Sequence, residues 1–305
     1  MRRLAFWGAI SAILAGGSAW AADLGVPEPI TTPDGVSTSG WTLQFTTYGW
    51  VPWLTGEAKI AGRSFDVDVG PQDIFKNLDW SQIPAWMSYM EARNGRLSLF
   101  NDIVYSKIAG SADFAKTVTR RVATLTLGGE IEADYEQATV EAGAAYEVWS
   151  SGSHGSAGVT AIDVLAGIRY WHQEASLSAN VNATLSIEGP RGLIGLSRSG
   201  NRVFAKSGSV DWVDPIVGAR LRHQVAPGQE LVLRGDIGGF GAGSDFSWQA
   251  IGTYNWQMCT VGGLVLNGYA GYRALQVDYE QGSGLKEYKY DVLQHGPVFG
   301  LTTNF

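Results

Sequence analysis

The sequence predicts an all-β fold, a closed antiparallel up-and-down β-barrel of about twelve strands, and three observations predict it. Apolar residues recur at every second position over most of the chain after residue 40, which is the periodicity of β-strands. Of the 305 residues, 45% are hydrophobic, only 17% are charged, and 40 are glycine. The chain also stops within an alternating segment, on Phe305.

The N-terminal residues predict export. Arg2 and Arg3 precede an apolar stretch that ends in small residues around Ala21, an A-x-A-like cleavage site. We expect residues 1–22 to be a cleaved signal peptide, with an uncleaved anchor as the alternative. Residues 23–39 are rich in Pro, Thr and Ser and predict a disordered segment. Residues 40–305 then form a single barrel domain.

Residues 246–256, FSWQAIGTYNW, show which kind of barrel to expect. One face carries aromatic residues at both ends, Phe246 and Trp248 at one and Tyr254 and Trp256 at the other, with small residues between them. The opposite face is mostly polar. Membrane barrels place aromatic side chains in two girdles at the interfaces and enclose a polar lumen. The length also suits a tilted membrane-spanning strand, so the sequence predicts a transmembrane barrel.

Similar alternation defines the other strands, and ten or fourteen remain as alternatives to twelve because closed bacterial barrels favour even numbers. The segment 119–149 counts as one long, bent strand. The predicted strands cover residues 41–54, 57–69, 82–93, 96–109, 119–149, 161–173, 176–187, 210–224, 229–240, 246–257, 260–279 and 286–305.

Connection lengths predict the two ends of the barrel, because outer-membrane barrels have long external loops and short periplasmic turns. Long connections on one side would be residues 150–158, 187–204, 241–245 and 281–285, and short ones on the other side residues 174–175, 226–230 and 258–260. Residues 70–80 have Ile74, Phe75 and Leu78 at helical spacing. They predict a short helix on the short-turn side, which either packs into the barrel mouth or covers a turn.

The ending GPVFGLTTNF fits a strand that closes a barrel, since lipid cannot satisfy an open sheet edge. Its outward residues Phe299, Leu301 and Phe305 resemble the C-terminal assembly signal of Gram-negative outer-membrane barrels. The resemblance implies that the barrel-assembly machinery is a partner and that outer-membrane lipid surrounds the barrel. The alternative is chance, because any β protein can end in Phe.

Several longer stretches carry a second resemblance: DWVDPIVGARLRH, GDIGGFGAGSDFSWQ, GYRALQVDYE, YDVLQHGPVFGL, AIDVLAGIRYW and LSLFNDIVYSKI. Together they cover most of the mature chain. They resemble a family of poorly characterised proteobacterial outer-membrane barrels that is similar to small porin-like barrels. The resemblance implies the fold and an outer-membrane location, and it brings no shared chemistry.

The polar face of these strands carries charges of both signs, which would meet in the lumen. An unpaired buried charge costs roughly several kcal/mol, so we expect these residues to pair. They either fill the lumen as a salt-bridged plug or line a narrow water-filled channel for small polar solutes or ions, with the arginines tuning its selectivity. The candidate residues are Glu91, Arg93, Asp102, Asp163, Arg169, Asp214, Arg220, Arg222, Arg234, Asp236 and Arg273.

Other function classes find less support. None of His154, His172, His223 and His295 lies in a catalytic motif, so we expect no enzyme, with a rim-site hydrolase as a minor alternative. The single Cys259 excludes an internal disulfide and a cysteine metal site, and no cofactor or metal is predicted. A net charge of -7 does not suit nucleic-acid binding. A soluble periplasmic ligand-binding barrel stays open, because alternation alone does not tell inside from outside.

Overall fold

The computed structural model describes residues 40–60, 63–78, 84–120, 123–152, 156–188, 195–261, 264–284 and 287–305. The predicted signal peptide and the segment 23–39 lie outside these residues. Within the described part, the helix is α1 (Pro71–Asn77), and the strands are β1 (Thr42–Trp50), β2 (Trp53–Ile60), β3 (Arg63–Val69), β4 (Ala85–Asn94), β5 (Leu97–Arg120), β6 (Ala123–Ser150), β7 (Thr160–Glu188), β8 (Gly195–Ala226), β9 (Gln229–Gly239), β10 (Phe246–Val261), β11 (Leu264–Gln281) and β12 (Tyr288–Asn304).

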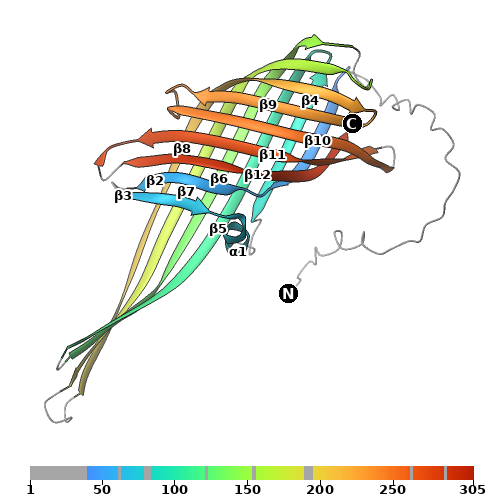
Figure 1. The fold of residues 1–305 in the computed structure, drawn as a ribbon. Helices are drawn as coiled ribbons and strands as arrows, with labels where there is room; N and C mark the ends of the chain where they lie inside the picture. Colours follow the sequence, from blue (N-terminus) through green and yellow to red (C-terminus); the bar gives the residue numbers. More distant parts are fainter. Residues whose placement is uncertain are drawn as a thin grey trace, which may run out of the picture. The chain divides into compact units, whose positions relative to one another are not determined.

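Ten of these strands close into a ring (Figure 1). From β4 to β12 each strand pairs antiparallel with its successor, and β1 pairs with both β4 and β12. In the closing pair, Phe299 lies opposite Gly49 and Leu301 lies opposite Thr47. The predicted closed antiparallel barrel is therefore confirmed, with ten strands in the ring and two further strands outside it.

The two further strands arise because both of the first predicted strands are divided: 41–54 ends early, and 57–69 is split between β2 and β3. Pro52 has no N–H to donate to a ladder, and β1 ends at Trp50 while β2 begins at Trp53. At this break the backbone passes very close to β12, since a Cβ atom on Gly296 would lie 2.1 Å from the carbonyl oxygen of Val51. The β2–β3 hairpin then pairs with the first half of β12 in place of β1.

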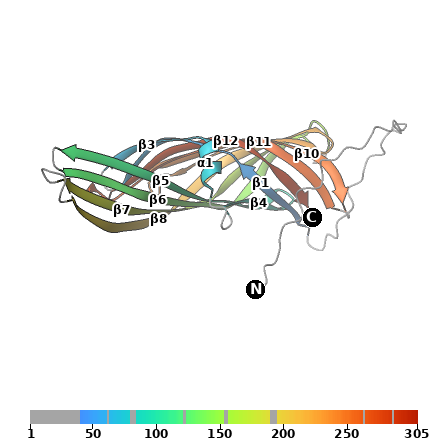
Figure 2. The same cartoon turned by 90° about the horizontal axis from the view of Figure 1, so that it is seen from below.

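Strands β5–β8 continue far beyond the ring, side by side in both views (Figures 1 and 2). Among the described residues, Lys107–Arg120 of β5 have β6 as their strand partner, apart from a single bridge of Ile108 to Leu78, and Gly195–Ser209 of β8 pair only with β7. We call these four outer segments the extension: residues 107–120, 123–136, 174–188 and 195–209. The end of the ring from which they project is the extension end, and the end where β1 begins and β12 ends is the terminal end.

The extension corrects several predictions. Residues 174–175 are not a turn, because β7 runs through them without a Gly or Pro to interrupt it. Most of the predicted loop 187–204 is strand; its Ser, Asn and Arg residues give no apolar face by which to recognise one. Strand β6 is continuous, as predicted for most of 119–149, but residues 119–120 belong to β5. The antiparallel order also places the connection 151–159 at the terminal end, beside the short turns.

The predicted short helix is confirmed as α1, but its predicted position is wrong. It follows the β2–β3 hairpin, whose second strand returns the chain to the level of Leu54. The next residue after the helix, Leu78, forms a bridge with Ile108 of β5 at the base of the extension. No side chain of α1 is buried, so the helix does not pack into the barrel mouth. In the described residues no helix is long and apolar enough to cross a membrane.

The two faces of the ring strands separate as predicted. In β10, Ser247 and Gln249 point inward and are buried, whereas Phe246 and Tyr254 point outward and are exposed. Large exposed apolar side chains surround the ring in the same way: Leu43, Trp86, Met90, Leu99, Tyr146, Val164, Ile168, Val213, Val217, Leu233, Ile237, Tyr272, Phe299 and Leu301. This arrangement, with polar side chains inside and apolar side chains outside, is the reverse of the arrangement in a soluble ligand-binding barrel.

Candidate functional site

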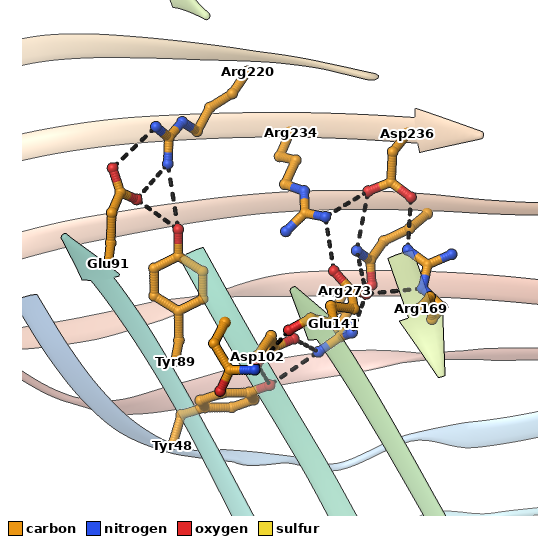
Figure 3. A network of polar contacts seen from close by, with 12 residues as sticks. Tyr48, Tyr89, Glu91, Asp102, Glu141, Arg169, Arg220, Arg234, Asp236 and Arg273 are labelled. Atoms are coloured by element: carbon orange, nitrogen blue, oxygen red, sulfur yellow. Dashed lines mark hydrogen bonds and ion pairs between the residues drawn. The ribbon is translucent and has the colours of Figure 1, made fainter. Parts of the chain in front are cut away.

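The interior of the ring is the candidate site, because charged side chains from seven of the ten ring strands meet there. All eleven charged residues predicted for the lumen face are turned inward. Ten of them join two ion-pair networks, together with Glu141 and Glu147 of β6. Figure 3 shows how several of these side chains converge.

The central network consists of Asp102, Glu141, Arg169, Arg234, Asp236 and Arg273, three carboxylates and three guanidinium groups. Glu141 lies at its middle. Its carboxylate oxygens lie 2.9 Å from Nε of Arg169, 2.7 Å from Nη2 of Arg234 and 3.4 Å from Nη2 of Arg273. Because Glu141 is fully buried, these three arginines supply its charge compensation in place of water.

The rest of the central network is also largely shielded from water, with the side chains of Asp102 and Arg234 only 5% and 8% exposed. Arg169 also donates to Asp236 at 2.6 Å, and Arg273 donates to Asp102 at 2.8 Å. The hydroxyl of Tyr48 donates to Asp102 at 2.6 Å (Figure 3). Charge-assisted hydrogen bonds of this kind are short and strong when both partners are held in place, so the network ties β1, β5, β6, β7, β9 and β11 together across the lumen.

The terminal-end network consists of Glu91, Arg93, Glu147, Asp163, Arg220 and Arg222. Arg220 bridges the lumen, since it donates to Glu91 of β4 at 2.5 Å and to Asp163 of β7 at 2.8 Å. Arg222 donates to Glu147 at 2.8 Å and to Asp163 at 3.0 Å. This network again holds three carboxylates and three guanidinium groups, so its formal charge is zero.

Solvent exposure falls from the terminal end toward the middle. The side chain of Arg93 is 19% exposed and that of Arg222 12%, whereas that of Arg169 is 0% exposed. Water therefore reaches the terminal-end network but not the centre of the central network.

An aromatic layer lies on the extension side of the central network. The rings of Trp171 and Trp212 are stacked with centroids 5.4 Å apart, and Trp212 stacks on Tyr279 at 4.0 Å. Val277 and Val292 are fully buried beside them. An interior filled by close-packed side chains leaves no room for a column of water at this level.

Asp214 is the predicted charge that joins neither network. It is fully buried, and its Oδ1 atom accepts a hydrogen bond of 2.7 Å from the backbone N–H of Ser244. The contact fixes the β9–β10 turn, where Phe240 adopts a positive φ of 53° between two glycines. Asp214 thus positions a turn at the extension end.

A cavity of about 150 Å³ lies on the terminal side of the central network. Its walls come from both networks, from the further carboxylate of Glu230 and from uncharged side chains. The lining residues are Gln44, Thr46, Tyr48, Tyr89, Glu91, Arg93, Asp102, Arg220, Arg222, Glu230, Val232, Arg234, Ile251, Thr253, Asn255, Tyr269, Arg273 and Val298. Such a volume holds several water molecules at about 30 Å³ each.

Sequence reasoning missed Glu141, Glu147 and the tyrosines that bond to the networks. In β6, the inward face carries Gln137, Thr139, Glu141 and Glu147. Their spacing by multiples of two residues in the sequence could have identified them as lumen residues. The signal was weak because small residues occupy both faces: the inward face also carries Gly143 and Ala145, and the outward face is rich in alanine.

The histidines lie away from the interior. His172 contacts the carboxylate of Asp211 at 2.7 Å, His223 bonds to Thr160 and His295 bonds to Tyr272. His154 lies outside the described residues. The described residues contain no cluster of three metal-ligating side chains.

Comparisons with known proteins give structural neighbours only. No family model matches the sequence, and no curated protein matches it. A Pseudomonas aeruginosa FadL homologue aligns with 87% of this chain and 89% of its own at 8% identity, with a TM-score of 0.24. The translocator domain of autotransporter NalP from Neisseria meningitidis aligns with 86% of this chain and 88% of its own at 9% identity, with a TM-score of 0.23. These scores carry no information on function.

Proposed function

We propose that this chain is an outer-membrane barrel with a sealed lumen, which holds the extension at the cell surface. The observation that carries the proposal is the filled interior. The central network has its charges compensated internally, and the aromatic layer closes the lumen on its extension side. An open porin needs a continuous aqueous path lined by charged rings.

The outer face supports a membrane location. On β10 the two aromatic ends, Phe246 and Trp256, are ten residues apart. At about 3.3 Å per residue and a strand tilt of about 40°, they are separated by roughly 25 Å across the membrane, the height of the apolar band in outer-membrane barrels. Exposed apolar side chains occupy the outside between them.

The orientation follows from the proposed export route. The N-terminal residues resemble a signal peptide, and Phe299, Leu301 and Phe305 on the outer face of β12 resemble an assembly signal. We propose that the barrel-assembly machinery reads this strand from the periplasm. Short turns would then lie in the periplasm with the terminal end, and the extension would face outward. We assign no enzymatic activity.

A gated channel for small polar solutes is the second candidate, and the exposure gradient favours it. Water reaches the terminal-end network and the cavity beyond it, so the terminal half of the lumen could already serve as part of an aqueous path. To conduct, the chain would have to separate Glu141 from its three arginines and move the stacked rings. Arg169, Arg220, Arg222 and Arg234 would then tune ion selectivity.

Single-channel recording of the refolded mature chain in a planar bilayer tests the proposal. If the lumen is sealed, the protein should insert into the bilayer and show no steady openings. Protection from protease digestion would confirm that it has inserted. The Trp212→Ala variant removes the ring that stacks on both Trp171 and Tyr279 and should increase brief openings, whereas Trp86→Ala on the outer face is the matched control. Steady, ion-selective openings of the unmodified protein would contradict the sealed lumen and support the channel.

A further inference from the structure

The extension continues the wall of the ring without a change of register. Pairing of β5 with β6 and of β7 with β8 runs from the ring into the extension with no irregularity in the described residues, and that of β6 with β7 is interrupted only at the terminal end. Because successive residues of a strand alternate between its two faces, the face that lines the lumen continues at odd positions of β6 and β7 and at even positions of β5 and β8. Tyr135 agrees with this assignment, since its hydroxyl donates to the buried lumen residue Gln137 at 3.1 Å. We call this continuation the inner face of the extension and the opposite one its outer face.

The inner face of the extension is apolar along its two middle strands. Every second residue from Ala123 to Tyr135 of β6 reads ALLGIAY, and every second residue from Ala175 to Ile187 of β7 reads ALAVALI. In the ring the same face holds both ion-pair networks, so the polarity of the wall reverses where the extension begins. With strands about 4.8 Å apart and a rise of about 3.3 Å per residue, these positions span a strip roughly 10 Å wide and roughly 40 Å long.

The charges of the extension are divided between its faces. The inner face has five basic positions, all on the edge strands β5 and β8, and no acidic one, whereas the outer face has seven acidic positions and one basic position. On the outer face, Glu132 and Asp134 are exposed and accept hydrogen bonds of 3.0 Å from Ser178 and 3.2 Å from Ser176. The outer face thus suits water, and the inner face is an apolar strip with basic residues along both margins. These basic residues are Lys116, Arg120, Arg198, Arg202 and Lys206.

This pattern identifies the kind of partner. Exposed apolar areas of several hundred Å² mark interaction sites. A second copy of the inner face would place basic positions against basic positions, so the face is not complementary to itself. An anionic lipid offers both chemistries that the face calls for, acyl chains for the strip and a phosphate for the arginines. Access is open, because among the described residues no strand covers the outer edges of residues 109–120 and 195–209 (Figure 1).

From these observations we propose that the inner face of the extension binds an anionic membrane lipid, with its acyl chains along β6 and β7 and its headgroup on the basic residues of β5 or β8. The site gives the extension a role of its own beyond being held by the barrel. It depends neither on whether the lumen is sealed nor on which side of the membrane the extension lies.

Fluorescence quenching at two neighbouring positions of β7 tests the proposal. In a Cys259→Ser background, Val181→Cys on the inner face and Asn182→Cys on the outer face each carry an environment-sensitive fluorophore, and the refolded mature chain is placed in phosphatidylcholine vesicles. Phosphatidylglycerol with a nitroxide on its acyl chain should quench the label at position 181 severalfold more than the label at position 182. Phosphatidylcholine with the same nitroxide, at the same concentration, should quench the label at position 181 severalfold less.

Two results would overturn the proposal. One is equal quenching at the two positions or by the two lipids, since the lipid would then recognise neither the face nor its charge. The other is a label at position 181 that is shielded from water but quenched by neither lipid, since a protein would then cover the inner face.

Two double variants, each made in the labelled Val181→Cys chain, locate the headgroup. Arg198→Gln with Arg202→Gln removes two basic residues of the inner face, the second of which lies opposite position 181 in the β7–β8 ladder. Quenching by the nitroxide-labelled phosphatidylglycerol should fall severalfold, because each basic residue near a membrane surface adds to the attraction of anionic lipid. The matched control, Glu132→Gln with Asp134→Asn, removes two exposed charges of the outer face and should not lower the quenching.

Heat-modifiable mobility on a gel reports folding of each variant. Unchanged quenching in a folded chain with both arginines replaced would contradict the assignment of the basic residues to the headgroup and overturn the proposal. If the arginine variant fails to fold, the comparison of positions 181 and 182 decides the question.

Discussion

The two ion-pair networks have the same composition, three arginines and three carboxylates, but different surroundings. The central network is closed off by the aromatic layer, and Glu141 and Arg169 within it are fully buried. The terminal-end network borders the cavity, and its Arg93 is 19% exposed. Since the contribution of an ion pair to stability depends on its access to water, removing a charge should cost more in the central network than at the exposed members of the terminal-end network.

The largest expected effect is that of Glu141→Gln. The substitution removes the charge that three buried guanidinium groups share, and breaking a buried pair costs about 3–5 kcal/mol. Urea unfolding in detergent micelles measures the free energy of unfolding. The matched control is Glu147→Gln on the same strand: Glu147 is itself buried, but its partner Arg222 is 12% exposed, so a smaller loss of about 1–2 kcal/mol is expected there. Equal losses in the two variants would contradict the difference between the networks.

A double-mutant cycle on Asp102 and Arg273 sharpens the comparison. Each single substitution, Asp102→Leu or Arg273→Met, leaves one buried charge without its partner at 2.8 Å. The double variant removes both charges, so the two losses should not add, and an interaction free energy of about 2–3 kcal/mol is expected. Strict additivity would show that the pair is not coupled. Tyr48 and Glu141 also bond to this pair, which limits the recovery.

The smallest expected effect is that of Arg93→Gln. Its contact to Glu91 is 3.0 Å long, its other two ion pairs are 3.7 and 3.9 Å long, and its side chain reaches solvent. A loss of about 0–1 kcal/mol is expected, and it should shrink at high salt because exposed charges are screened. Glu141→Gln should show no such salt dependence. A large, salt-independent loss for Arg93→Gln would mean that the terminal-end network is also dry.

The alternation of single strands predicted the part of this arrangement that a strand encodes by itself. Asp163 and Arg169 of β7, and Asp214, Arg220 and Arg222 of β8, were placed on one face because their neighbours in sequence are apolar. The partition into two networks was not predictable, since it depends on which strands lie across the ring from each other. Glu91 and Arg220, for example, are 129 positions apart and meet at 2.5 Å.

The long strands and the outer hairpin escaped prediction for related reasons. Alternating hydrophobicity identifies a strand only where one face contacts lipid or an apolar core and the other face contacts water or polar groups. Residues 173–176 of β7 (QEAS) lack that contrast, so the sequence there looked like a turn between two strands, 161–173 and 176–187. Pro52 could have been recognised as the end of a strand. The course of the chain after it depends on the pairing of β2 with β12, which the sequence of β2 does not reveal.

The most direct test of the sealed lumen compares thiol labelling at two inward positions of β10 in a Cys259→Ser background. Ser247 is 0% exposed on the extension side of the central network, and Asn255 borders the cavity on the terminal side. A membrane-impermeant methanethiosulfonate reagent should label Asn255→Cys rapidly in folded protein and leave Ser247→Cys unmodified from either side of the membrane. Labelling of both positions at similar rates would show that water passes the central network, and it would contradict a sealed barrel.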